Sequence, residues 1–311
     1  MSNLLKGRDF VSLNDFTTEE IWQIVEMARS MKLRMRSGIM DRPLEGKTLG
    51  MIFTKPSTRT RISFEVGIWQ LGGVGLFLSA EELQLRRGET IEDTARVLSR
   101  YLDGIMIRTF DHQDVVDLAA NSTIPVINGL TDLLHPCQAA SDILTIWEKF
   151  GRVAGIKFAF TGDGNNNMVH SLLFAGAKMG MDVRVASPEG FQPEPSIVQD
   201  AQALARKTGA RILVTKDPVE AVRDADAVYA DVWTSMGQEE SKDQRLTTLM
   251  PYQVNADLWE HVAESAIFMH CLPAHREEEV TGEIIDGPMS VVFDQAENRL
   301  HAQKAIMALT M

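Results

Sequence analysis

Residues 49–65 read LGMIFTKPSTRTRISFE, an apolar run, a polar turn and a second apolar pattern. Residues 49–53 predict a strand, and the apolar spacing after the turn predicts a helix. Residues 57–60 therefore lie at a helix N-terminus, where N–H groups are unpaired and the helix dipole is positive. Three hydroxyls and a guanidinium there form an anion site suited to phosphate, although such residues are also ordinary caps. Because the P-loop pattern is missing, we expect the phosphate on a small molecule rather than a nucleoside triphosphate.

Strand-like apolar runs alternate with helical patterns along the whole chain. Such alternation predicts βαβ units, so the expected fold class is α/β, with two doubly wound parallel-sheet domains of similar size. The break falls near 147–155, where one helix ends and a fresh strand begins. Strands are expected at 48–53, 74–78, 104–108, 125–128, 156–161, 182–186, 211–215, 226–231, 266–270 and 290–293. Helices are expected at 17–37, 57–71, 90–102, 112–121, 137–150, 166–179, 194–208, 217–224, 252–263 and 294–309, and the polar stretch 232–250 as a loop over a site.

Composition narrows the class of function. A net charge of -12 over 311 residues argues against nucleic-acid binding, which needs a basic face. No apolar run approaches the length of a membrane span, so no membrane association is expected. Two cysteines make no disulfide framework, and the N-terminus has no apolar segment of signal-peptide length, so a cytoplasmic location is expected.

The candidate site residues share one position in the predicted fold. They all follow the carboxyl ends of strands, where open α/β sheets bind their ligands. They are Ser57, Thr58, Arg59 and Thr60 after the first strand, Arg108 at the end of 104–108, His135 and Gln138 after 125–128, Asn166 and Asn167 after 156–161, Asp231 at the end of 226–231, and His270, Cys271 and Leu272 at the end of 266–270.

Each motif suggests a chemistry and also admits a structural interpretation. His135 and Gln138 can hydrogen-bond a carbonyl and an amide, or simply start a helix. Arg108 suits an anion or its carbonyl, or marks a strand's exit to solvent. Asp231 can pair with an ammonium group or cap a turn. Cys271 can be buried or nucleophilic, and no His/Cys spacing fits zinc, so no metal is expected.

Residues 162–167, GDGNNN, resemble a dinucleotide-binding turn only in part. The third glycine of that pattern is replaced by Asn167, and no acidic ribose partner ends the next strand. We therefore expect no cofactor. We expect instead that Asn side chains in this turn bind an amino-acid carboxylate. An NAD-linked dehydrogenase and a non-catalytic phosphate-metabolite sensor remain the alternatives from other classes.

With these residues assembled, the chain resembles the aspartate/ornithine carbamoyltransferase family nearly end to end, and its ornithine branch most closely. The residues that carry the resemblance are Ser57–Arg61, His135-Pro136-Cys137-Gln138, Asp231–Gly237 and His270-Cys271-Leu272-Pro273. The resemblance implies a carbamoyl-phosphate-binding domain, 1–147, and an ornithine-binding domain, 148–311, whose last helix, about 294–309, returns to the first domain. It also implies a homotrimer, or a multiple of trimers, with active sites at subunit interfaces.

The resemblance also assigns roles. It implies that Ser57, Thr58, Arg59 and Thr60 hold the phosphate, with Gln84 from a neighbouring subunit, and that Arg108, His135, Gln138 and Arg299 act on the carbamoyl group. Asn167, Asp231, Ser235 and Met236 then hold the α-carboxylate and α-amino groups of ornithine, with Cys271 and Leu272 near its δ-amine. Two loop residues depart from the family pattern: Arg86 stands where relatives tend to have glycine, and Glu277 stands where glycine is frequent in the biosynthetic branch.

The implied reaction is carbamoyl transfer from carbamoyl phosphate to the δ-amine of ornithine, giving citrulline and phosphate through a tetrahedral intermediate. An alternative acceptor such as aspartate, putrescine or an N-acylornithine remains open. The sequence also leaves open whether the reaction serves arginine synthesis or breakdown.

Overall fold

The computed structural model describes residues 5–79, 88–234 and 242–311. The described chain divides into two compact units, unit 1 with residues 1–144 and 297–311 and unit 2 with residues 145–296. The chain leaves unit 1 within helix α5 (Pro136–Phe150) and returns to it within α12 (Val292–Thr310). Among the described residues, no helix has both the length and the apolar character that crossing a membrane requires.

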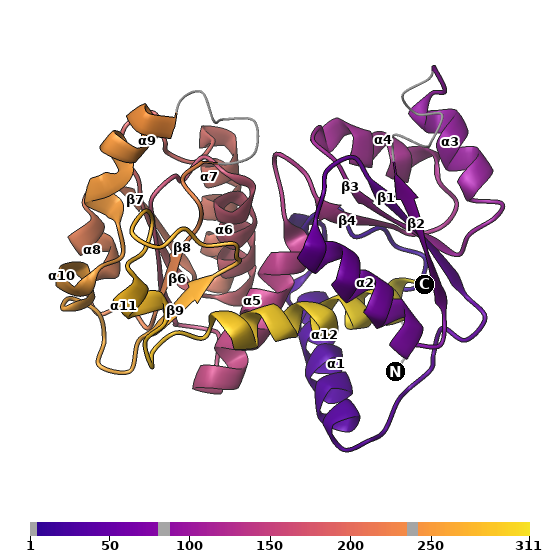
Figure 1. Ribbon diagram of the computed structural model, residues 1–311, viewed down its shortest axis with the longest axis horizontal. Helices are drawn as coiled ribbons and strands as arrows, with labels where there is room; N and C mark the ends of the chain where they lie inside the picture. Colours follow the sequence, from indigo (N-terminus) through magenta and orange to yellow (C-terminus); the bar gives the residue numbers. More distant parts are fainter. Residues whose placement is uncertain (1–4, 80–87, 235–241) are drawn as a thin grey trace. The chain divides into compact units, whose positions relative to one another are not determined.

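Unit 1 contains a parallel four-stranded sheet in the order β2-β1-β3-β4. The central strand β1 (Thr48–Phe53) pairs with β2 (Val74–Ser79) and β3 (Gly104–Arg108), and β4 (Val126–Leu130) lies beyond β3. Helix α2 (Thr58–Gln70) covers one face, and α3 (Ile91–Leu98) and α4 (His112–Asn121) cover the other (Figure 1). Apolar strand residues such as Ile52 and Ile105 pack against α3 and α4 in a buried core.

Helix α1 (Thr18–Arg36) begins with the predicted capping box: Thr17 accepts a bond from the Glu20 N–H, and the Glu20 side chain accepts one from the Thr17 N–H. Its Lys32 is buried and donates to Asn298 of α12 over 2.6 Å. Residues 297–311, which include most of α12, belong to unit 1. The C-terminal helix therefore packs back toward the first domain, as expected.

Unit 2 contains a parallel five-stranded sheet in the order β7-β6-β5-β8-β9. The strands are β5 (Lys157–Thr161), β6 (Asp182–Ala186), β7 (Arg211–Thr215), β8 (Ala227–Ala230) and β9 (Ile267–His270). Figure 1 shows α6 (Asn167–Met179) and α7 (Pro195–Thr208) on one side of the sheet, and α8 (Pro218–Val222) and α10 (Ala256–Trp259) on the other. The described residues also contain α9 (Lys242–Leu249), α11 (Gly282–Ile285) and the 3-10 turns η1 (Leu13–Asp15) and η4 (Met250–Tyr252).

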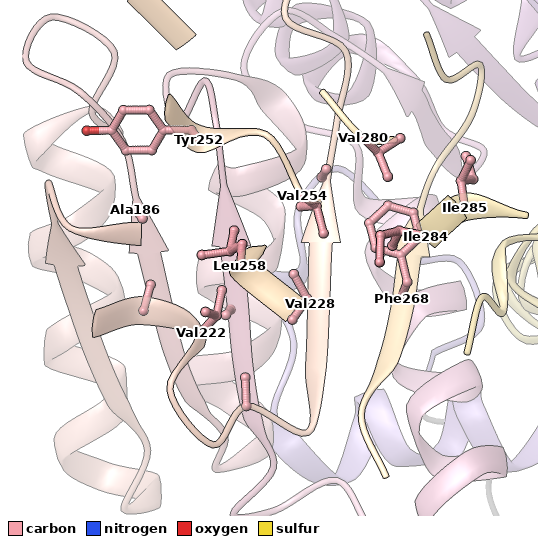
Figure 2. Packing of buried hydrophobic residues seen from close by; sticks show 14 of the residues in the cluster. Ala186, Val222, Val228, Tyr252, Val254, Leu258, Phe268, Val280, Ile284 and Ile285 are labelled. Atoms are coloured by element: carbon pink, nitrogen blue, oxygen red, sulfur yellow. The ribbon is translucent and has the colours of Figure 1, made fainter. Parts of the chain in front are cut away.

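Figure 2 shows the apolar cluster that joins the short helices of unit 2 to its sheet. Val222 of α8 and Leu258 of α10 pack with Val228 of β8, Phe268 of β9 and Ile284 of α11. Each of these side chains is at most 8% exposed. Burial of this kind stabilises roughly 1.5–3 kcal/mol per large side chain, so helices of four or five residues are held by packing rather than by their own propensity.

The structure departs from the sequence prediction at three places. Residues 290–293 are not a strand: Ser290 makes one isolated bridge to Phe268, and α12 begins at Val292. A short apolar run is ambiguous between strand and helix, and its neighbours decide. The helix predicted over 252–263 shrinks to α10, because Asn255 caps a new start by accepting from the Leu258 N–H. The loop predicted over 232–250 contains α9 in its described part.

Each sheet has a topological switch point, which is the place where doubly wound folds bind their ligands. In unit 1 the strand order reverses between β1 and β3, and in unit 2 between β5 and β8. The crevice beyond the carboxyl ends of such a strand pair is the usual ligand site. The segments after β1 and β3, and after β5 and β8, therefore position the functional side chains.

Candidate active site

The phosphate-type site in unit 1 is built around the first turn of α2. Ser57 is its N-cap, and the Ser57 hydroxyl accepts a hydrogen bond from the Thr60 N–H over 3.3 Å. Ser57 and Arg59 are half-buried and Thr58 is exposed, whereas Thr60 is buried. The remaining N–H groups of this turn and the helix dipole favour an anion at the exposed end.

Two guanidinium groups converge on Thr60. Its Oγ1 atom accepts one bond from Arg108 Nη1 and another from Arg299 Nη2, each over 3.2 Å. Arg108 ends β3 and Arg299 lies on α12, so two separate elements bring guanidinium groups to one helix end. Arg299 is only 3% exposed, which makes its charge far more effective than that of a solvated arginine.

His135 and Gln138 belong to the same constellation. Burial, followed by the positive charges of Arg299, Arg108 and Arg59, holds the pKa of His135 well below its usual value. The imidazole is therefore neutral at physiological pH and can donate one hydrogen bond without adding charge. Gln138 accepts from Arg299 Nη1 over 2.7 Å and donates to Asp142 over 2.8 Å, so both ends of its amide are engaged by protein groups.

A cavity of about 710 Å³ lies beside this helix end. It is lined by Lys55, Ser57 and Thr58, and by Arg61, Ile62, Glu65 and Phe77 among others. The Arg61 guanidinium stacks on the Phe77 ring, 3.8 Å from its centre. The cavity touches the outer side of the phosphate-type site, between α2 and β2, whereas the buried Thr60 and Arg299 do not line it.

The candidate ornithine residues of unit 2 gather at the ends of β5, β8 and β9. Asn166 caps α6 by accepting from the Val169 N–H over 2.9 Å, and Asn167 is the first residue of that helix. Asp231 accepts from Cys271 Sγ over 3.1 Å, and burial raises the pKa of this carboxyl. An ammonium group placed beside Asp231 would offset that desolvation and lower the pKa again.

The turn after β9 is held by a buried histidine. Leu272 has a φ of 58°, a left-handed conformation that is unfavourable for a bulky residue. Its N–H donates to His270 Nδ1 over 2.9 Å, and His270 Nε2 lies 3.2 Å from the buried Glu279 carboxylate. The surroundings therefore fix a strained turn that carries Cys271 and Leu272 toward the site, an arrangement typical of functional positions.

Asp231, His270 and Cys271 also place three possible metal-ligand atoms within 4.8 Å of one another. His270 Nδ1 accepts from the Leu272 N–H, and His270 Nε2 lies 3.2 Å from the Glu279 carboxylate without a hydrogen bond of its own among the described residues. A metal at this place would have to displace one of these partners. The grouping is accounted for better as a carboxylate beside a thiol, with the histidine holding the turn.

The glycines of the GDGNNN turn are used for packing within the protein. A Cβ atom on Gly164 would lie 2.4 Å from Ser187 Oγ, and one on Gly162 would lie 2.8 Å from Trp233 Nε1. The space that these glycines leave is filled by side chains of the chain itself. This loop therefore offers no close backbone approach of the kind that a pyrophosphate needs.

Sequence reasoning missed several members of these constellations. Asp142, Glu279 and Gln303 act through contacts with residues that it did name, and Arg245 pairs with Asp163 at the end of β5. Asp163 stood inside the recognised GDGNNN turn, which was the one available signal. Three predicted site residues, Gln84, Ser235 and Met236, and the departure Arg86 lie outside the described residues.

Comparison with known proteins covers nearly the whole chain. The family model for the carbamoyl-P binding domain of aspartate/ornithine carbamoyltransferase matches residues 8–148, and that for its Asp/Orn binding domain matches residues 154–310. The chain is 60% identical to an ornithine carbamoyltransferase of Thermococcus kodakarensis, over 99% of this chain and 97% of that protein. It is 61% identical to one of Symbiobacterium thermophilum, over 99% of each chain.

Solved structures give the same result for the fold. The ornithine carbamoyltransferase of Pyrococcus furiosus superposes with a TM-score of 0.96 at 57% identity, over 99% of this chain and 98% of that chain. The enzyme of Gloeobacter violaceus superposes with a TM-score of 0.88 at 46% identity, over 98% of this chain and 99% of that chain.

Proposed function

The chain belongs to the aspartate/ornithine carbamoyltransferase family, and from this we propose that it transfers the carbamoyl group of carbamoyl phosphate to the δ-amine of L-ornithine. The products are L-citrulline and phosphate. The observation that carries the proposal is the meeting of Arg108 and Arg299 on Thr60, beside the neutral His135, at the N-terminus of α2. Such a site matches a ligand that has a phosphate at one end and a polar carbonyl at the other.

In this proposal unit 1 holds carbamoyl phosphate. Ser57, Thr58, Arg59 and Thr60 bind the phosphate, and Arg108 reaches both phosphate and carbonyl. Arg299, His135 and Gln138 surround the carbonyl oxygen. Because Gln138 accepts from Arg299 and donates to Asp142, it also orients that guanidinium.

Unit 2 holds ornithine in the same proposal. Asn167, Asp231, Ser235 and Met236 bind the α-carboxylate and α-amino groups, and Cys271 and Leu272 lie by the δ-amine. The δ-amine must be neutral to react, whereas a free alkyl ammonium has a pKa of about 10.4. Desolvation beside Leu272, whose turn is fixed by His270, lowers that value and favours the neutral amine.

The chemical step then needs no covalent enzyme intermediate. The δ-nitrogen lone pair forms a bond to the carbonyl carbon, and negative charge develops on the carbonyl oxygen, where Arg299 and His135 stabilise it. The carbon–oxygen bond to phosphate breaks with its electron pair on the phosphate, which leaves toward Arg59 and the helix end. The departing phosphate takes up the proton that the amine loses, so charge and atoms balance.

We also propose that the chain assembles with copies of itself, as a trimer or a multiple of trimers. Five large apolar side chains are exposed on the α2 and β2 side of unit 1: Ile62, Trp69, Val74, Leu76 and Phe77, at 37–61% exposure. Ile62 and Phe77 of this patch also line the 710 Å³ cavity, and a second copy covering the patch would remove apolar area from water. A neighbour's loop around Gln84 then reaches the phosphate-type site. We place the protein in the cytoplasm, where its two free thiols stay reduced.

The test is a colorimetric citrulline assay with carbamoyl phosphate and a panel of acceptors. L-Ornithine should give ureido product, while aspartate, putrescine and N-acetylornithine should each give less than about one hundredth of that rate, because each leaves a polar group of the ornithine site unpaired. Light scattering alongside reports the number of subunits. A faster rate with another acceptor would replace ornithine in the proposal, and a monomer would remove the assembly.

A further inference from the structure

Side chains of helix α12 pack directly over a glycine of α2. A Cβ atom on Gly67 of α2 would lie 3.0 Å from Met307 Cε and 3.3 Å from Lys304 Cγ. In Figure 1, α2 crosses the part of α12 that belongs to unit 1. The close approach brings Arg299 and, one turn later on the same face of α12, Gln303 against the first turns of α2.

Gln303 is fully buried and connects two elements of the site. Its neighbours assign the orientation of its amide. The oxygen accepts from Arg299 Nη2 over 2.9 Å and from Arg299 Nε over 3.2 Å, and the nitrogen donates to Ser63 Oγ over 2.5 Å. Ser63 Oγ in turn donates to the backbone carbonyl of Arg59 over 2.6 Å. A continuous chain of hydrogen bonds therefore links the Arg299 guanidinium to the phosphate-type turn.

This arrangement solves a specific problem for a buried guanidinium. Arg299 carries five N–H donors in a rigid fork, and those not aimed at a ligand need acceptors. A carboxylate in this place would neutralise the charge that the reaction uses, whereas an amide oxygen accepts the same two hydrogen bonds and leaves the charge intact. Gln138 and Thr60 engage the remaining side of the fork, again without a negative charge.

We propose that Gln303 is a positioning residue for carbamoyl transfer: it fixes the plane of the Arg299 guanidinium against the Arg59 turn, through Ser63, so that the Arg299 N–H groups meet the carbonyl oxygen as charge develops. This inference rests on the proposed function. It places the effect on turnover rather than on ground-state binding, because the carbonyl gains most of its charge in the transition state. Gln303 itself touches no substrate.

The test compares Gln303→Met, which keeps length and apolar volume but removes both hydrogen-bonding groups, with Lys304→Met. Lys304 is the next residue of α12, is also buried, and bonds Gln70 rather than Arg299. Gln303→Met should lower kcat about ten- to hundredfold, with KM for both substrates within about threefold of the parent. Lys304→Met should keep kcat within about twofold. The Arg299 Nε–H resonance should exchange faster with water in Gln303→Met only.

Ser63→Ala provides a second measurement that does not depend on a change at Gln303. It should give a smaller loss of kcat, and the double variant should lose no more than Gln303→Met alone, because both changes break one chain of bonds. A double variant whose loss is the product of the two single losses would overturn the inference. So would a Gln303→Met protein with parental kcat, or an equal loss in Lys304→Met.

If Gln303→Met does not fold, the result for Ser63→Ala decides: parental kcat with unchanged exchange at Arg299 Nε refutes the link. Failure of the proposed function is distinguishable, because the parent would then form no citrulline from carbamoyl phosphate and ornithine. An active parent with an unaffected Gln303→Met would refute only the positioning role.

Discussion

The thiol of Cys271 donates a hydrogen bond to Oδ1 of Asp231 over 3.1 Å. The register of neighbouring parallel strands produces this contact: Ala230 of β8 is paired with His270 of β9, so the next residue of each strand emerges side by side. A carboxylate and a thiol thus stand together at the carboxyl edge of the unit 2 sheet. The reactivity of this thiol can therefore report directly on the proposed ornithine site.

The two thiols should differ sharply in reactivity. Cys137 is buried, donates to the Asn128 carbonyl, and has its pKa raised to about 12 by burial. Cys271 is partly exposed. An aromatic disulfide reagent should therefore modify one thiol per native chain, and L-ornithine should slow that reaction. Cys271→Ala should abolish the fast phase; two thiols titrating in the native protein would contradict the assignment.

Asp231→Asn should raise the KM for ornithine far more than that for carbamoyl phosphate. Losing one charge-assisted hydrogen bond costs about 1.5–3 kcal/mol, which is roughly ten- to hundredfold in ornithine affinity. Asp226→Asn is a matched control, since Asp226 lies at the other end of β8 and binds the Lys157 N–H, an acceptor role that asparagine keeps. Equal effects on both substrates would remove Asp231 from the ornithine site.

His135 should stay neutral through the whole physiological range. Its pKa is depressed, first by burial and then by Arg299, Arg108 and Arg59. The native protein therefore binds fewer protons at this site than the unfolded chain, so the stability that it contributes is present above about pH 6.5 and is lost as the pH falls. Proton NMR of the imidazole should show no titration between pH 8 and 6.

Replacement of Arg299 tests the cause of that shift. Of the three arginine charges, that of Arg299 lowers the pKa of His135 the most, so in Arg299→Met this pKa should rise toward its ordinary value. Turnover should fall because the carbonyl oxygen loses a hydrogen-bond donor. An imidazole that titrates near pH 6.5 in the parent would contradict the neutral form assigned here.

Much of this site was predictable because it is built by strand order. Ser57 and Arg108 in unit 1, and Asn167 and Asp231 in unit 2, lie at or after strand ends, and the carboxyl edge of each parallel sheet gathers its own residues whatever the loop details. The fold class followed for the same reason, from alternating apolar patterns. Periodicity was sufficient there because each pattern was long.

Contacts across long stretches of sequence could not be predicted. Gln303 looked like any polar residue of the last helix, and its role depends on Gly67, which lets α12 approach α2. Glu279 comes close to His270 only in the folded chain, nine residues further along the sequence, so its role could not be predicted. The short run 290–293 failed as a strand because its neighbours, not its composition, decide whether α12 has begun.

Asp163 should make the protein less stable as the pH rises through the weakly acidic range. Burial raises the pKa of this carboxyl to about 6, with Arg245 acting in the opposite direction. The folded state therefore holds the proton more tightly than the unfolded chain, whose pKa is about 3.8. Stability due to this group is full below the unfolded value and declines up to about pH 6.

Two variants isolate that contribution. Asp163→Asn should remove a negative slope of up to about 1.4 kcal/mol per pH unit from the unfolding free energy in that window, as measured by urea titration. Arg245→Met should raise the pKa of Asp163 further, because it removes the charge that favours the carboxylate. Identical pH profiles for the parent and Asp163→Asn would show that the group does not titrate there.

Glu277 should be replaceable by glycine but not by alanine. It has a φ of 69°, which costs a non-glycine residue about 1 kcal/mol. Its side chain offsets that cost: Glu277 Oε1 accepts from the Gly282 N–H over 2.9 Å, at the start of α11. A hydrogen bond of this kind is worth about 0.5–1.5 kcal/mol.

Glu277→Gly relieves the backbone strain but loses the hydrogen bond to Gly282. The unfolding free energy should therefore stay within about 1 kcal/mol of the parent. Glu277→Ala keeps the strained conformation and loses the hydrogen bond, so it should be about 0.5–1.5 kcal/mol less stable than the parent. Urea unfolding of the three proteins measures both differences, and kcat should not change in either variant. An alanine variant as stable as the parent would show that the Gly282 contact does not offset the strain.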